Sequence, residues 1–218
     1  MKLKRSTLFF YSLTDLPIKI ALFGILVFIP KFYSVDMGVS LAVAANIILA
    51  VRIFDVITDP LFGFINDRTT TRWGKRRPWL AISTPLMMLS VYMLFMPPEG
   101  SGAAHLFIWM MLLSIATTMI MIPYYAWGAE LSPDYNERSR VTGWREMLGL
   151  VGSLSAQLIP SAALLFFGLG GSANVLTIVG ISMVILMPIC VALTLAKFRK
   201  LRNTLNLPFR RYKVSSLC

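Results

Sequence analysis

Six long apolar stretches constrain the fold of this chain more than any other feature of its sequence. A helix needs about 20 mostly apolar residues to cross a bilayer, and the Leu, Ile, Met and Ala content of these stretches favours helices over the short alternating strands of a membrane barrel. The composition agrees, with 56% hydrophobic and only 14% charged residues and a mean hydropathy of +0.70. The sequence therefore predicts an all-α integral membrane bundle over residues 1–196, with spans at Leu8–Phe32, Gly38–Ile65, Trp79–Met96, Ala103–Gly128, Thr142–Phe167 and Asn174–Ala196.

The positive charges indicate how these spans are oriented. Seventeen of the 21 lysines and arginines lie in the N-terminal tail, in the loops after the second and fourth spans, or after the sixth span, and the opposite loops hold only Lys31. By the positive-inside rule, both termini are expected in the cytoplasm. Basic loops that set topology need no acidic partner, so the net charge of +11 predicts contact with the lipid bilayer and no nucleic-acid partner.

Charged residues also lie inside the spans, where lipid would exclude them. The second span holds three of them, Arg52, Asp55 and Asp59. Each costs about 2.5 to 3.5 kcal/mol at a helix centre, so three facing lipid would cost roughly 8 to 10 kcal/mol. They are therefore expected to face the protein interior or a watery cavity.

Asp55 and Asp59 are four residues apart and share one helix face. Two close carboxylates in a low-dielectric site do not both ionise readily, so either one holds a proton or a cation lies between them. Arg52 relieves part of the repulsion, and Thr58 adds a hydroxyl oxygen of the kind that hard cations prefer. This pattern favours a proton or sodium site, and a structural ion-pair network between helices is the alternative.

A second set of polar residues points to a solute. Asp15 and Lys19 are also four residues apart, so an intrahelical salt bridge between them is one interpretation. The alternative is that Asp15 accepts hydrogen bonds from a polar substrate. Tyr125 follows a proline in the fourth span, and Arg145 lies within the fifth. Aromatic faces and an arginine fork suit a polyhydroxyl ligand, although tyrosines near a membrane boundary also act as interface anchors.

Motifs for other chemistry are missing from the sequence. His105 has no cysteine, histidine or carboxylate cluster near it, the two cysteines form no disulfide framework, and no nucleotide-binding or hydrolase motif occurs. The sequence therefore predicts no enzyme activity, no cofactor, and no metal beyond a coupling Na⁺.

Two segments resemble a known family. The pattern Gly63-x-x-x-Asp67-Arg68 followed by Arg72-Trp73-Gly74-Lys75-Arg76-Arg77 resembles the loop signature of the major facilitator superfamily. The longer stretches "RIFDVITDP", "DRTTTRWGKRRPW" and "IPYYAWGAELSPDYNERSRVTGWRE" resemble the glycoside–pentoside–hexuronide:cation symporter family, and the similarity runs from about Asp15 to the end of the sixth span.

The resemblance implies cation-coupled symport of a sugar-like or glycoside-like solute by alternating access, with Na⁺ or H⁺ as the coupling ion. It implies roles for the matching positions: cation binding for Asp55, Asp59 and Thr118, solute binding for Asp15, Arg145 and Tyr125, and a cytoplasmic gate formed by Gly63, Asp67, Arg68, Arg72, Gly74, Arg76 and Arg77.

Two positions depart from the family pattern. Thr58 stands where a family member has an asparagine beside the cation, so the choice between Na⁺ and H⁺ as the coupling ion stays open. Met121 stands where that member has a second sugar-binding aspartate, which favours, as a further alternative, a lysolipid-type carrier of the same superfamily.

The family fold is two six-helix bundles with the solute between them. This chain has six spans and then residues 197–218, a basic segment that resembles the start of the family's central cytoplasmic loop. With the C-terminal bundle absent, we expect a second half or a second chain to complete the transporter. The alternative is a non-transporting truncated remnant or an assembly subunit. The expected location is the plasma membrane, as in a bacterial inner membrane.

Overall fold

The computed structural model describes residues 3–71, 73–168 and 171–205, and these form eight α-helices. Six helical units are long and apolar enough to cross a membrane, which confirms the predicted all-α membrane fold. In chain order the helices are α1 (Arg5–Ser12), α2 (Asp15–Val27), α3 (Ile29–Val35), α4 (Leu41–Arg68), α5 (Arg77–Phe95), α6 (Ala103–Glu130), α7 (Tyr135–Phe167) and α8 (Ser172–Leu205).

The first predicted span is broken into α1, α2 and α3. The break between α1 and α2 falls at Leu13 and Thr14, where Pro17 cannot donate to the carbonyl of Leu13 and its ring crowds that carbonyl. Pro30 stands in the first turn of α3 and accounts for the second break, at Phe28, in the same way.

Two helices extend beyond their predicted bounds on the basic side. Helix α7 begins at Tyr135 and not at Thr142, because the Asp134 side chain accepts a hydrogen bond of 2.9 Å from the Asn136 backbone N–H and caps the helix there. Helix α8 continues to Leu205, so the first part of the segment predicted over 197–218 is helical, and residues 206–218 lie outside the described part of the chain.

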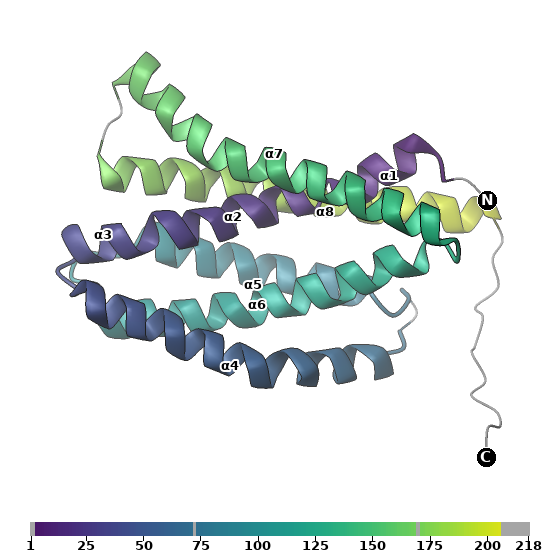
Figure 1. The fold of residues 1–218 in the computed structure, drawn as a ribbon, viewed down its shortest axis with the longest axis horizontal. Helices are drawn as coiled ribbons and strands as arrows, with labels where there is room; N and C mark the ends of the chain where they lie inside the picture. The colour runs from purple at the N-terminus through teal and green to yellow at the C-terminus, as the bar shows by residue number, and fades with distance from the viewer. Residues whose placement is uncertain (1–2, 72, 169–170, 206–218) are drawn as a thin grey trace.

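The helices run side by side along the long axis of the bundle (Figure 1). Helix α6 packs between α4 and α5, α2 packs against α7 and α8, and α5 packs against α8 and so joins the two groups. The start of α1 and the end of α8 lie at the same end of the bundle (Figure 1).

Two tyrosines link α1 to α6 through reciprocal hydrogen bonds. The Tyr11 hydroxyl donates to the Tyr124 carbonyl at 2.8 Å, and the Tyr124 hydroxyl donates to the Tyr11 carbonyl at 2.9 Å. The two rings stack with centroids 4.7 Å apart, and both side chains are fully buried. Both phenol groups are therefore satisfied inside the apolar core.

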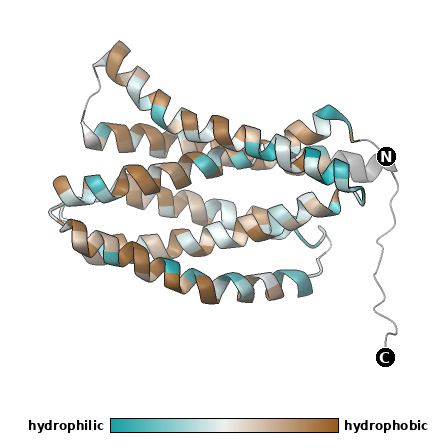
Figure 2. Ribbon diagram, viewed as in Figure 1, coloured by the Kyte–Doolittle hydropathy of each residue, from teal (hydrophilic) through white to brown (hydrophobic). Residues whose placement is uncertain are grey.

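Helices α4 and α7 are rich in hydrophobic residues (Figure 2), and many of their large apolar side chains are exposed. Val56 and Ile57 of α4 are 73% and 69% exposed, and Leu150 and Leu158 of α7 are 65% and 63% exposed. Such surfaces suit lipid or another apolar protein face and not water.

Helix α2 crosses α7 closely because Gly152 has no side chain. A β-carbon at Gly152 would collide with the backbone carbonyl of Leu16, which cannot swing aside. We expect Gly152→Ala to destabilise the bundle by about 1 to 3 kcal/mol through overpacking, and to lower the Tm of detergent-purified protein. Gly143 of the same helix has open space where its β-carbon would stand. Gly143→Ala is therefore the matched control, and an equal loss of Tm in both variants would contradict the close crossing.

Candidate functional site

A cavity of about 340 Å³ lies between α2, α4 and α6, and its walls hold the polar residues of the second span. Two carboxylates, one arginine, three hydroxyls and one phenol line it: Asp55, Asp59, Arg52, Ser114, Thr117, Thr118 and Tyr125. The remaining walls are apolar and include Met110, Leu113 and Met121 of α6. The prediction that the charges of the second span face a cavity agrees with this placement.

Each carboxylate in the cavity accepts a hydrogen bond from a hydroxyl of α6. Ser114 donates to one carboxylate oxygen of Asp55, and Thr118 donates to Asp59 at 2.7 Å. The other oxygen of Asp55 lies 3.3 Å from Nη1 of Arg52. The Asp55 side chain is 15% exposed whereas Arg52 is 68% exposed, so the site opens on the outer face of α4.

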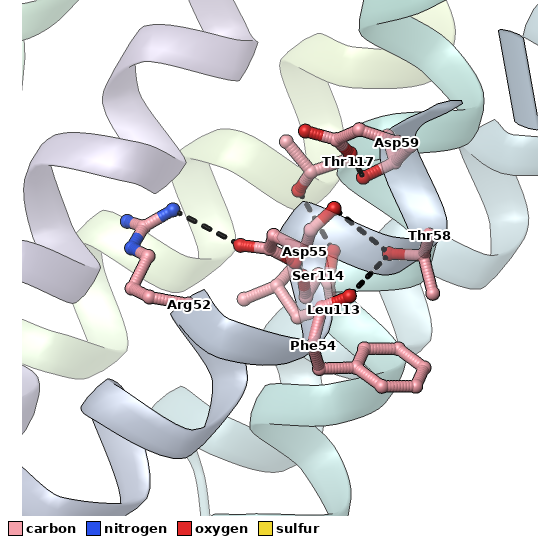
Figure 3. Close-up of polar contacts among 9 residues, drawn as sticks. Arg52, Phe54, Asp55, Thr58, Asp59, Leu113, Ser114 and Thr117 are labelled. Atoms are coloured by element: carbon pink, nitrogen blue, oxygen red, sulfur yellow. Dashed lines mark hydrogen bonds and ion pairs between the residues drawn. The ribbon is translucent and has the colours of Figure 1, made fainter. Parts of the chain in front are cut away.

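The structure places Thr58 differently from the other predicted cation residues. Its hydroxyl donates to the Phe54 carbonyl of its own helix at 3.1 Å, its side chain is buried, and it is not among the residues that line the cavity (Figure 3). A threonine in a helix satisfies its hydroxyl in this way when no outside acceptor lies within reach. The oxygens that meet the carboxylates come instead from Thr118, which the resemblance implied, and from Ser114, which sequence reasoning missed.

Of the three predicted solute residues, Tyr125 lines the cavity, and Arg145 and Asp15 do not. The guanidinium of Arg145 stacks over the Tyr125 ring, 4.0 Å from its centroid, and donates to Glu146 at 2.6 Å. Asp15 is fully buried, and neither of its carboxylate oxygens has a hydrogen-bond partner among the described residues.

The described ion pair of Lys19 is with Glu146, at 3.9 Å, and not with Asp15. The sequence spacing allowed a pair within one helix as one of two readings, but Glu146 on the adjacent helix α7 holds the ammonium group of Lys19 instead. A buried carboxyl group without a partner is costly, and it is available to a ligand or a proton.

The predicted gate residues gather at the basic end of α4. Gly63, Asp67 and Arg68 belong to α4, the backbone φ of Gly74 is +107°, and Arg72 lies outside the described residues. The guanidinium of Arg68 lies over Phe64, and that of Arg77 lies over the Trp127 ring, 5.8 Å from its centroid.

Arg76 joins this loop to two helices. It donates to Asp67 at the end of α4, at 2.9 Å, and to Glu130 at the end of α6, at 2.8 Å. Burial works against its charged form, but the hydrogen bonds to Glu130 and Asp67 outweigh that effect and raise the pKa of the Arg76 guanidinium. Sequence reasoning missed Glu130, because nothing in the local pattern shows that the end of the fourth span returns to this loop.

A family model described as MFS/sugar transport protein matches residues 10–210. The putative glycoside/cation symporter YagG of Escherichia coli is 29% identical over 73% of this chain and 36% of its own length. The isoprimeverose transporter of Lactiplantibacillus pentosus is 27% identical over 76% of the chain and 35% of its own length. The sodium-dependent lysophosphatidylcholine symporter 1 of Mus musculus is 33% identical over 58% of the chain and 26% of its own length.

The chain thus spans about a quarter to a third of the length of the curated relatives it matches. The match covers all six membrane-crossing helices and most of the basic segment after them. The matched family is one of transport proteins and not of enzymes, in agreement with the sequence-based prediction. With six membrane-crossing helices and a family match over residues 10–210, this multi-pass membrane protein belongs to the MFS/sugar transport protein family.

Proposed function

We propose that this protein takes part in secondary active transport, as cation-coupled symport of a small sugar-like or glycoside-like solute by alternating access. The observation that carries the proposal is the cavity in which Asp55 and Asp59 each accept a hydrogen bond from a hydroxyl of α6. Charged residues inside a span are rare because of their cost in a membrane, and where they occur they are typical of ion and substrate pathways.

The solute is proposed to bind beside the cation and against Tyr125, with Arg145 and Asp15 as the nearby polar groups. Tyr125 supplies a ring face to the cavity, Arg145 supplies a guanidinium fork, and Asp15 supplies an unpartnered carboxyl. Apolar faces of a sugar stack on aromatic rings, and sugar hydroxyls bond to charged groups. The relatives named for glycosides or isoprimeverose support this solute class.

A second six-helix half is part of the proposal. Arg52 and Asp59 are exposed on α4, inside a membrane-crossing helix, and lipid would penalise both. Another bundle that covers α4 and α7 would bury them against protein and close the cavity. We place the assembled protein in a plasma membrane, as in the inner membrane of a bacterium, with both termini in the cytoplasm because of the distribution of lysine and arginine.

The direct test is uptake by vesicles of native membrane, in which the protein keeps any second half, with a panel of radiolabelled glycosides and imposed gradients. A Na⁺ gradient and a pH gradient are applied separately, and empty vesicles supply the background. Gradient-driven accumulation of a glycoside supports symport and identifies the ion. Accumulation equal to the background under both gradients, with protein of verified orientation, would contradict the proposal and favour a remnant or an assembly subunit.

A second candidate solute is a lysolipid. Leu22, Met110, Leu113 and Met121 make one side of the cavity apolar, which suits an acyl chain better than a sugar. The relative named as a lysophosphatidylcholine symporter supports the same candidate. Lysophosphatidylcholine is therefore tested in parallel with the glycosides, and whichever class accumulates under a cation gradient decides between them.

Arg76 is proposed to hold the cytoplasmic gate, through its bonds to Asp67 and Glu130. We expect Arg76→Gln to lower the initial rate of uptake about tenfold, because one closed state loses two charge-assisted hydrogen bonds. Lys75→Gln is the matched control, since it removes an equal charge from an exposed side chain of the same loop. If both variants slow uptake equally, loop charge and not the Arg76 cluster governs the rate.

A further inference from the structure

We propose that Ser114 is a second hydroxyl of the cation site, which positions Asp55 and supplies an oxygen to a bound Na⁺. This inference rests on the proposed function, because it assigns the ion and one more residue to the same site. No sequence motif pointed to Ser114, and it enters only through its contact with Asp55 across the α4–α6 interface.

The register of α4 against α6 pairs Ser114 with Asp55 in the same way as Thr118 with Asp59. Asp55 and Asp59 are four residues apart on α4, and their partners Ser114 and Thr118 are four residues apart on α6. Residues four apart lie on the same helix face, about 5 to 6 Å from each other. The packing of α4 on α6 therefore produces two matched carboxylate–hydroxyl pairs, one helical turn apart, in one cavity.

Ser114 differs from most nearby hydroxyls in its hydrogen-bond acceptor. Most hydroxyls of the neighbouring helices donate to a carbonyl of their own helix: Thr117 to Leu113 at 2.7 Å, and Ser90 to Leu86 at 2.9 Å. Ser114 donates across the interface to Asp55 instead. A hydroxyl has one proton and two lone pairs, so a serine that gives its proton to a carboxylate keeps its acceptor capacity for a cation.

The chemistry and charge of the site residues suit a hard monovalent cation. Asp55, Asp59, Ser114 and Thr118 offer oxygen only, which suits hard cations and not soft metals. Arg52 lies against Asp55 and adds one positive charge to two carboxylates. One monovalent cation brings this group to electroneutrality, whereas a divalent cation would leave an excess of positive charge. These features point to Na⁺.

The test is calorimetric titration of the purified protein in lipid nanodiscs with NaCl, at constant ionic strength maintained with choline chloride. We expect Ser114→Ala to weaken Na⁺ binding about tenfold, equivalent to ~1.4 kcal/mol. Ser114→Thr keeps the hydroxyl and is expected to bind within about twofold of the unaltered protein. Ser114→Cys has nearly the same volume but a soft donor, and is expected to weaken Na⁺ binding as Ser114→Ala does.

Ser90→Ala is the matched control, because it removes a buried hydroxyl that bonds only to its own helix. The role of Ser114 would be overturned if Ser114→Ala and Ser114→Cys bound Na⁺ as well as Ser90→Ala does, while Asp55→Asn still lost binding. The proposed function would then remain standing. If the unaltered protein released no heat on addition of NaCl but released heat on a change of pH, Na⁺ would be overturned as the ligand. No response to either would contradict the cation site as a whole.

Discussion

Replacing Asp55 with asparagine is expected to abolish cation-driven accumulation of solute. Asp55 is 15% exposed and contacts both Arg52 and Ser114, so its carboxylate is the better enclosed of the two in the cavity. A unit charge at about 4 Å contributes about 4 kcal/mol at an effective dielectric constant of 20. Loss of that charge corresponds to roughly a thousandfold loss of cation affinity. Asparagine preserves the size of the side chain, so the effect is electrostatic.

The measurement is uptake into vesicles under an imposed Na⁺ or pH gradient, together with binding of the solute in the absence of a gradient. We expect accumulation to fall to that of empty vesicles while solute binding persists. Asp134→Asn is the matched control, because Asp134 caps α7 on the surface and asparagine caps a helix equally well. Unchanged gradient-driven uptake in Asp55→Asn would exclude Asp55 from coupling.

Replacing Arg145 with glutamine is expected to have the opposite pattern, with solute affinity lost and the cation response retained. The Arg145 guanidinium stacks on Tyr125, is held by Glu146 and is only 14% exposed, so its direction is fixed before a solute arrives. A charge-assisted hydrogen bond is worth about 1.5 to 3 kcal/mol, which corresponds to a loss of solute affinity of roughly 10- to 150-fold. Arg145→Lys is expected to recover little, since lysine lacks the planar fork.

Competition binding with whichever solute accumulates, followed by Na⁺ titration of the same variant, measures both effects. Arg5→Gln serves as the control, because Arg5 is exposed at the start of α1. If Arg145→Gln lowers solute and cation binding together, the two sites are not separable and the variant has altered the bundle as a whole. Taken with Asp55→Asn, the two variants distinguish ion binding from solute binding.

The spans could be predicted from the sequence because their signal is local. Twenty apolar residues bounded by charges identify a membrane helix without knowledge of its neighbours. The bounds were wrong where short-range chemistry overrides hydropathy: Pro17 splits the first span at Leu13, and the Asp134 cap starts α7 before its apolar stretch begins. Both signals are present in the sequence, but they act over one turn and a hydropathy average hides them.

The partners of the predicted site residues could not be predicted from the sequence, since they lie on other helices. Lys19 forms an ion pair with Glu146 and not with Asp15, and Arg76 forms one with Glu130. Both ion pairs depend on how α7 and α6 pack against the rest of the bundle. Ser114 is an intermediate case. Its spacing of four residues from Thr118 repeats the spacing of Asp55 and Asp59, and that match could have been noticed once α4 and α6 were known to be neighbours.

The reciprocal tyrosines of α1 and α6 have a consequence for how such a bundle changes shape. Sliding one helix along the other would break both tyrosine hydrogen bonds together and strand two buried hydroxyls, at about 1 to 3 kcal/mol for each. The Tyr11 hydroxyl also lies so close to Gly128 that a β-carbon at that position would collide with it. Shear between α1 and α6 is therefore costly, and these two helices are expected to move together when the bundle changes shape.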